Sequence, residues 1–207
     1  MSIIRPFKGI RPRADLASAI AALPYDVYNS EEAREIVAAE PKSFLQIDRA
    51  ETLLPKGTNP YSEAVYKTAS ETLNRMIDEG SFLQDKEPCY YLYALTMNGR
   101  TQTGLVGCAS IDDYCNNVIL KHEITLEAKE QDRIRHIDAC SAQTGPIFLA
   151  YRADKKLGEI IKNVRLTPEV YDFTSDDGIR HEVWRIDKMS TIVDISKIFE
   201  AIPHLYI

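Results

Sequence analysis

Hydrophobic residues recur at the helical period in two stretches of the first eighty positions. Asn29 and Glu32 have the spacing of a capping box, and they predict a helix over 31–40 whose first turn is acidic. Apolar side chains at every third or fourth position predict a second helix over 60–79, which Gly80 would end. The first segment therefore carries a start signal and the second a stop signal, in addition to the hydrophobic period.

Two pairs of strand-like runs are each divided by the signal of a tight turn. Near 89–109, Asn98-Gly99 separates two runs rich in aromatic and aliphatic residues, which is the strongest short hairpin signal in a sequence. Near 170–186, an Asp-Asp-Gly sequence separates a second pair. We therefore predict two antiparallel hairpins.

The remaining segments predict shorter elements. Further strands are predicted over 43–48, 118–120 and 147–151, and further helices over 126–141, 154–163 and 190–202. Prolines make the first 28 residues look irregular. Because strands and helices do not alternate strictly, the fold class is α+β: a mixed, largely antiparallel sheet, with hairpins near 89–109 and 170–186, packed by several helices.

The charge balance narrows the choice of partners. The chain has 207 residues, with 25 Lys and Arg against 31 Asp and Glu, so its formal net charge is −6. Nucleic acid is therefore not expected as a partner, because domains that bind it usually carry a basic surface. No Gly/Ser linker or internal repeat interrupts the sequence, which predicts a single α+β domain over 1–207 with no internal boundary.

The apolar segments favour a cytoplasmic protein without membrane contact. No apolar run approaches the roughly 20 residues that span a bilayer, and the N-terminus lacks the apolar region of a signal peptide. Four cysteines without a Cys-x-x-Cys pair predict reduced thiols and no metal site. The apolar, strand-like end at 202–207 looks cut within an element, so we expect the N-terminal portion of a longer protein.

Ionisable residues gather most densely between positions 119 and 136. An apolar strand end runs into Lys-His-Glu at 121–123, and a charged helix follows. Four of its residues are separated by steps of three or four and should share one helical face: Lys129, Asp132, Arg133 and His136. Ile134 and Ile137 are expected on another face, packed on the sheet.

This cluster has the residue types of a phosphate or carboxylate site, because Lys, Arg and a helix N-terminus attract anions and nearby carboxylates and imidazoles can move protons. The candidate catalytic residues are His122, Glu123 and Asp132. The candidate phosphate- or substrate-binding residues are Lys121, Lys129, Arg133, His136 and Asp26, the last from a Pro-Tyr-Asp-Val segment before a helix.

Each candidate also has a structural interpretation. A charged helix face is usually solvated and laced with weak ion pairs, and Asp26 could serve only a local turn. His122-Glu123 does not begin a zinc-protease helix, because Leu126 stands where the second histidine is required. Tyr90, Tyr91 and Tyr93 are expected in the core rather than on a base-stacking platform, because no basic residues are interleaved with them.

The order of these segments resembles a large uncharacterised prokaryotic family built on a conserved domain of unknown function. The resemblance covers essentially the whole chain, and it rests on Arg5-Pro6-Phe7-Lys8-Gly9-Ile10-Arg11-Pro12, Pro24-Tyr25-Asp26-Val27, Gln102-Thr103-Gly104-Leu105-Val106-Gly107, Lys121-His122-Glu123, Lys129 and Asp132-Arg133. Members are about twice as long and carry an Asp-Gly-His-His-Arg motif beyond the equivalent of Ile207. That motif is similar to the phosphate-binding motif of the ParB/sulfiredoxin superfamily, which includes free-serine kinases.

The resemblance implies the N-terminal portion of a nucleotide-dependent phosphotransferase that acts on a small hydroxylated metabolite, with serine as one example. The full-length protein would use ATP or ADP with Mg²⁺, whereas this chain alone would bind no cofactor and be inactive. Its partners would be the small-molecule substrate and the missing C-terminal half; the oligomeric state is left open. Two alternatives stay open: a ParB-like, nucleotide-switched module that binds DNA or protein, and a non-catalytic scaffold with an internal ion-pair network.

Overall fold

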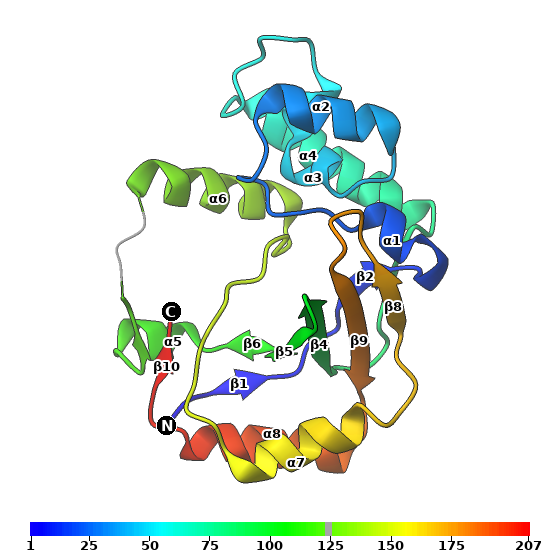
Figure 1. The fold of residues 1–207 in the computed structure, drawn as a ribbon. Coiled ribbons are helices and arrows are strands. Elements are labelled where there is room, and N and C mark those ends of the chain that lie inside the picture. The colour runs from blue at the N-terminus through cyan, green and yellow to red at the C-terminus, as the bar shows by residue number, and fades with distance from the viewer. Residues whose placement is uncertain (123–125) are drawn as a thin grey trace. The chain divides into compact units, whose positions relative to one another are not determined.

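The computed structural model describes residues 1–122 and 126–207, which form two compact units (Figure 1). The sheet unit comprises 1–14, 84–122 and 147–207, and the helical unit comprises 15–83 and 126–146. The chain thus leaves the first unit and returns to it twice. No Gly/Ser linker marks these crossings, and the single domain predicted over 1–207 stays a prediction.

An antiparallel sheet of two hairpins forms the centre of the sheet unit, with the strand order β5-β4-β9-β8. Its strands are β4 (Tyr90–Met97), β5 (Arg100–Val106), β8 (Tyr171–Thr174) and β9 (Arg180–Ile186). At the first turn Asn98 and Gly99 have φ values of 51° and 76°, the positive values that a type I′ turn requires. Both predicted hairpins are confirmed, and so is the α+β fold class.

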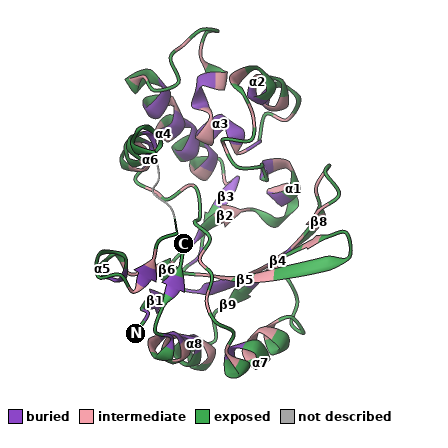
Figure 2. Ribbon diagram, turned by 60° about the vertical axis from the view of Figure 1, so that its left-hand side comes forward, coloured by how far each residue is buried: buried purple, intermediate pink, exposed green. Residues whose placement is uncertain are grey.

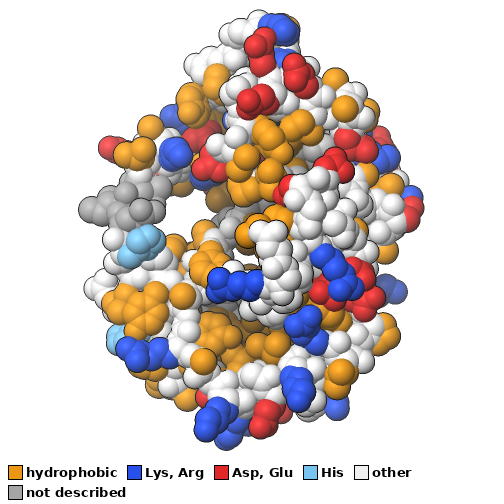
Figure 3. Space-filling view, viewed as in Figure 1, with side chains coloured by type: hydrophobic (Ala, Val, Ile, Leu, Met, Phe, Trp, Pro, Cys, Tyr) orange, Lys and Arg blue, Asp and Glu red, His pale blue; other side chains and the backbone are white. Residues whose placement is uncertain are grey.

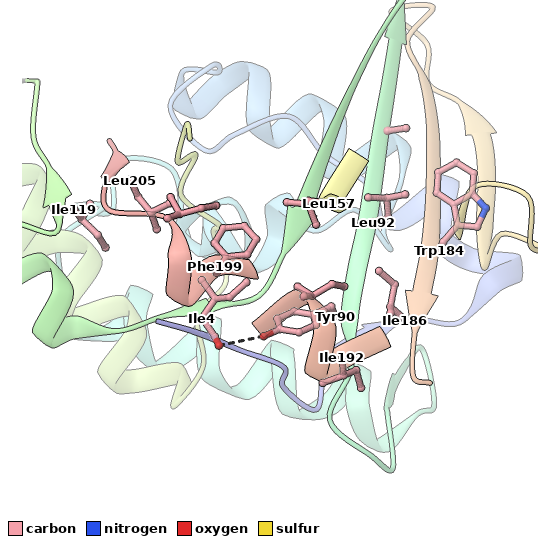
Figure 4. Close-up of a cluster of buried hydrophobic side chains, with 13 residues drawn as sticks. Ile4, Tyr90, Leu92, Ile119, Leu157, Trp184, Ile186, Ile192, Phe199 and Leu205 are labelled. Carbon is pink, nitrogen blue, oxygen red and sulfur yellow. Dashed lines mark hydrogen bonds between the residues drawn. The ribbon is translucent and has the colours of Figure 1, made fainter. Parts of the chain in front are cut away.

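Two helices cover the apolar core of this sheet: α7 (Lys155–Val164) and α8 (Met189–Ala201). Both were predicted, and Asp154 caps α7 by accepting the Leu157 amide at 2.9 Å. Figure 4 shows Leu92, Trp184 and Phe199 among the packed side chains, with the Tyr90 hydroxyl donating to the Ile4 carbonyl at 3.1 Å. Tyr90 is therefore a core residue, as expected.

Short strands complete the sheet unit. β1 (Ile4–Arg5) pairs antiparallel with β6 (Cys108–Ala109), and β7 (Ile119–Leu120) pairs parallel with β10 (Leu205–Tyr206). The apolar chain end is thus a strand, and the strand predicted over 118–120 is confirmed. The other short elements are β2 (Ile10–Pro12), β3 (Phe82–Gln84), where the chain crosses between the units, and α5 (Ile111–Cys115).

The helical unit packs around a core that includes Ile47, Ala69, Leu73 and Met76. Its helices are η1 (Ala14–Leu16), α1 (Ala17–Ile20), α2 (Ser30–Ala39), α3 (Leu45–Asp48), η2 (Ala50–Leu53), α4 (Glu63–Asp78) and α6 (Glu127–Cys140). Figure 2 shows buried residues on α3 and α4. The capping box between Asn29 and Glu32 is present at the start of α2 as predicted.

Three local predictions were wrong. Segment 43–48 contains the helix α3 instead of a strand, because a short apolar run fits either element and the packing against α4 and η2 decides. Segment 147–151 is not a buried strand, since Ile147 is 66% and Phe148 70% exposed. The first 28 residues hold β1, β2 and α1 rather than irregular backbone alone. Within the described ranges, no helix has both the length and the apolar character needed to cross a membrane.

Candidate functional site

The helical unit places Asp26, Lys129, Asp132, Arg133 and His136 on or beside α6. The four residues on α6 share a face as predicted, but two of them are buried: Asp132 is only 8% exposed and His136 only 2%. Ile134, which was expected to pack inward, is 43% exposed. The interpretation as a solvated face is therefore wrong for Asp132 and His136. The helix buries a polar stripe, which needs internal partners because an unpaired buried charge is costly.

Asp132 receives those partners from two sides. The Tyr66 hydroxyl of α4 donates to Asp132 Oδ1 at 2.9 Å, and Arg133 donates to Oδ2 through Nε at 2.9 Å and Nη2 at 2.7 Å. Burial raises the pKa of Tyr66 to about 12, and its bond to the Asp132 carboxylate adds to the rise. The phenol therefore keeps its proton and remains a donor.

Arg133 is held between a ring and a second carboxylate. Its guanidinium carbon lies 4.1 Å from the centre of the Tyr25 ring, a cation–π distance. Its Nη1 lies 3.9 Å from Asp48 Oδ1, at the C-terminal end of α3. One guanidinium thus serves both Asp132 and Asp48, so neither carboxylate has a cation of its own.

Asp48 is a further acid of the cluster that the sequence did not single out, and its side chain is largely buried. Burial raises the pKa of Asp48 and the nearby Asp132 charge adds to this, although the Thr144 bond, His136 and Arg133 act in the opposite direction. Among the described residues, buried Asp48 Oδ1 has no hydrogen-bond partner. The net effect is a carboxyl group that holds a proton more readily than usual.

His136 lies within reach of that carboxyl group. Its Nε2 donates to the Ile47 carbonyl at 3.0 Å and lies 4.0 Å from Asp48 Oδ1, while Nδ1 faces the Thr144 hydroxyl at 3.4 Å. Cys140 Sγ is 3.9 Å from the same Nδ1, but burial raises the pKa of this thiol to about 11. His136 is therefore held by a carbonyl on one side and a hydroxyl on the other, whereas Cys140 is a poor nucleophile at neutral pH.

Arg49 positions the loop that carries Tyr25 and Asp26. Its Nη1 donates to the carbonyls of Tyr25 at 2.9 Å and Tyr28 at 2.7 Å, and its Nε donates to Glu51 at 2.8 Å. The loop is thereby fixed where Asp26 lies 3.8 Å from Lys129 Nζ. That pair is half-exposed and contributes little stability by itself, so its importance is to place one acid and one cation at the accessible edge of the cluster.

The Lys121-His122-Glu123 segment is not joined to this cluster by the described structure. Lys121 and His122 belong to the sheet unit, where Lys121 Nζ lies 3.7 Å over the Tyr114 ring and the His122 amide donates to the Ile207 carbonyl at 3.1 Å. His122 Nδ1 also contacts that carbonyl. Glu123 lies outside the described residues. The role expected for this segment therefore stays a prediction.

The donor set also limits which groups the site can hold. Within 1–122 and 126–207, no three His, Cys, Asp or Glu side chains come together in the way that a metal ion requires. The accessible cations are Lys129 and the partly exposed Arg133.

The sequence comparisons agree with the resemblance noted from the motifs. A family model described as "Protein of unknown function (DUF1015)" matches residues 4–207. The chain therefore belongs to this family. No curated protein and no solved structure matches the chain.

Proposed function

We propose that the α6 cluster is the acceptor side of a phosphotransferase site, where the hydroxyl group of a small metabolite such as serine is activated. The observation that carries this proposal is the placement of the largely buried Asp48 carboxylate, whose Oδ1 lies 3.9 Å from Arg133 Nη1 and 4.0 Å from His136 Nε2. A base works best when its pKa lies closer to neutral than that of an ordinary carboxylate. Burial moves the pKa of Asp48 in that direction, and within the described residues its Oδ1 accepts no hydrogen bond.

In the proposed reaction, the hydroxyl oxygen of the metabolite attacks phosphorus while its proton passes to the Asp48 carboxylate. The new O–P bond forms as the bond between phosphorus and the leaving nucleotide oxygen breaks. Lys129 and Arg133 neutralise charge that develops on the phosphoryl oxygens, and Asp132 orients Arg133. ATP or ADP with Mg²⁺ would supply the phosphoryl group.

The test is a phosphotransfer assay on the full-length protein with serine and ATP or ADP. Asp48→Asn keeps the shape of the side chain but cannot accept the proton, so turnover should fall by about 10²- to 10⁴-fold. Asp138→Asn, on the exposed side of α6, is the matched control and should retain full turnover. His122→Asn and Glu123→Gln test separately the two catalytic candidates that lie outside the described cluster. Unchanged turnover in Asp48→Asn would exclude the proposed base.

A scaffold is the second candidate, and a specific observation favours it. Asp132, Arg133 and Tyr66 bind mainly one another, which is the pattern of an internal ion-pair network. In that case the full-length protein would transfer no phosphate, and every cluster variant would change stability alone. The ParB-like alternative predicts tight, salt-sensitive DNA binding in an anisotropy titration, and the net charge of −6 argues against it.

A further inference from the structure

A second surface of the helical unit has the character of a binding site and lies on α2. It is an open hollow of about 590 Å³, a volume within the range of ligand pockets. The hollow is lined by Val27, Tyr28, Glu32, Glu35, Ile36 and Ala39. None of these residues takes part in the Asp48–Asp132–Arg133–His136 cluster, so the hollow is independent of the proposed reaction.

The floor of the hollow is apolar and fixed in place. Val27 is half-exposed in the loop before α2, and it lies beside Ile36 and Ala39 of that helix. Arg49 holds the loop on both sides of Val27 through the carbonyls of Tyr25 and Tyr28. A floor that is already ordered loses little conformational entropy when a ligand binds.

The rim of the hollow is acidic, and the arginine of the same helix turn is directed elsewhere. Glu32 and Glu35 are three residues apart and so project from the same side of α2. Arg34 lies between them in sequence, but its Nη1 donates to the carbonyls of Thr52 at 2.8 Å and Leu54 at 2.7 Å. The rim therefore keeps its negative charge. Figure 3 shows hydrophobic and acidic side chains together in the region of α2.

We infer that this hollow docks a basic amphipathic helix of a partner protein. One apolar side chain of that helix packs on Val27 and Ile36, while Lys or Arg residues three or four positions away face Glu32 and Glu35. Charge complementarity selects this occupant, because burying the rim against a neutral or acidic surface would leave Glu35 without a cation and would remove Glu32, whose Oε2 accepts the Asn29 amide at 2.9 Å, from water. The hollow is open and is formed by one helix and the loop before it, which suits a helix laid against it rather than a domain interface.

The test uses a labelled synthetic peptide with Leu and Lys at spacings of three and four, and a scrambled peptide of the same composition. Fluorescence anisotropy should show saturable binding that weakens at high salt. Glu35→Lys should weaken binding about tenfold or more. Glu32→Gln should weaken it less, because glutamine can preserve the capping box at Asn29. Glu71→Lys, the same charge change on the exposed side of α4, is the matched control and should have little effect.

Amide shifts in the ¹⁵N spectrum should locate the peptide at Val27, Tyr28, Ile36 and Ala39. The inference is overturned if the scrambled peptide binds as tightly, if Glu35→Lys and Glu71→Lys weaken binding equally, or if the shifts fall elsewhere. A second copy of the chain is the other possible occupant of the hollow, and sedimentation of the chain alone tests for it. Self-association that Glu35→Lys abolishes would assign the hollow to a second copy of the chain and would also overturn the inference.

Discussion

Replacing Asp85 with alanine should destabilise the sheet unit by about 3 kcal/mol, because it leaves two guanidinium groups without their shared acceptor. Asp85 is buried and accepts from Arg11 at 2.8 and 2.9 Å, from Tyr91 at 2.6 Å and from Arg185 at 3.0 Å. Trp184 is the single tryptophan and lies in the sheet core. Urea unfolding followed by its fluorescence therefore measures the loss in this unit.

The same carboxylate predicts how stability depends on pH. Burial alone would raise the pKa of Asp85, but the bonds from Arg11, Tyr91 and Arg185 lower it from 3.8 to about 2. Because the pKa of Asp85 is lower in the folded than in the unfolded protein, the ionised carboxylate stabilises the fold at pH values above the unfolded-state pKa. This stabilisation of about 2 kcal/mol is lost as the pH falls from about 4 to about 2. Asp85→Ala should lose that part of the pH dependence.

Asp187→Asn is the matched control for Asp85. Asp187 also binds Arg185, at 2.8 and 3.2 Å, but it lies at the exposed end of the pair. An exposed ion pair contributes about 0–1 kcal/mol, so this variant should unfold close to the wild type. Equal losses in Asp85→Ala and Asp187→Asn would contradict the claim that burial makes the Asp85 network important.

Asp132→Ala should have the second large effect, a loss of about 3 kcal/mol in the helical unit. The substitution leaves the Tyr66 hydroxyl buried without an acceptor and Arg133 without its two bonds to Oδ2. Hydrogen exchange at the amides of α4 and α6 should therefore accelerate by about two orders of magnitude, since each factor of ten corresponds to about 1.4 kcal/mol.

Two further variants make this result specific. Asp132→Asn can still accept from Tyr66 and should be affected less than Asp132→Ala. Asp138→Ala removes an exposed acid from the same helix and should change stability by about 0.5 kcal/mol or less. If Asp132→Ala and Asp138→Ala exchange at the same rates, the charged face of α6 is solvated after all.

Local signals predicted the helices and hairpins well. Asn29 with Glu32, Asn98-Gly99 and Asp154 each specify a cap or turn through bonds to neighbours along the chain, so they operate whatever the rest of the fold does. Segment 43–48 was mispredicted because its apolar residues fit a strand or a helix equally well. Contacts with α4 and η2, more distant in sequence, select the helix.

The arrangement of the charged residues on α6 could be predicted only in part, for the same reason. The helical period placed Asp132, Arg133 and His136 on one face, but it could not show which face is buried. Which face of α6 is buried depends on partners such as Tyr66, which lies 66 residues from Asp132 in the sequence. Asp48 and Arg49 went unnoticed because their partners are likewise distant, in α6 and in the loop before α2. The site role expected for Lys121 and His122 stays a prediction, and Glu123 lies outside the described residues.

The role of Asp48 as a proton acceptor is tested most directly by titrating its carboxyl carbon, followed by ¹³C NMR. The resonance can be assigned by its disappearance in Asp48→Asn. Because burial and the adjacent Asp132 charge favour the protonated form, we predict a pKa of Asp48 clearly above its ordinary value of 3.8. A measured pKa at or below 3.8 would contradict this role, since Asp48 would then be an ordinary ion-pair partner and not a proton acceptor.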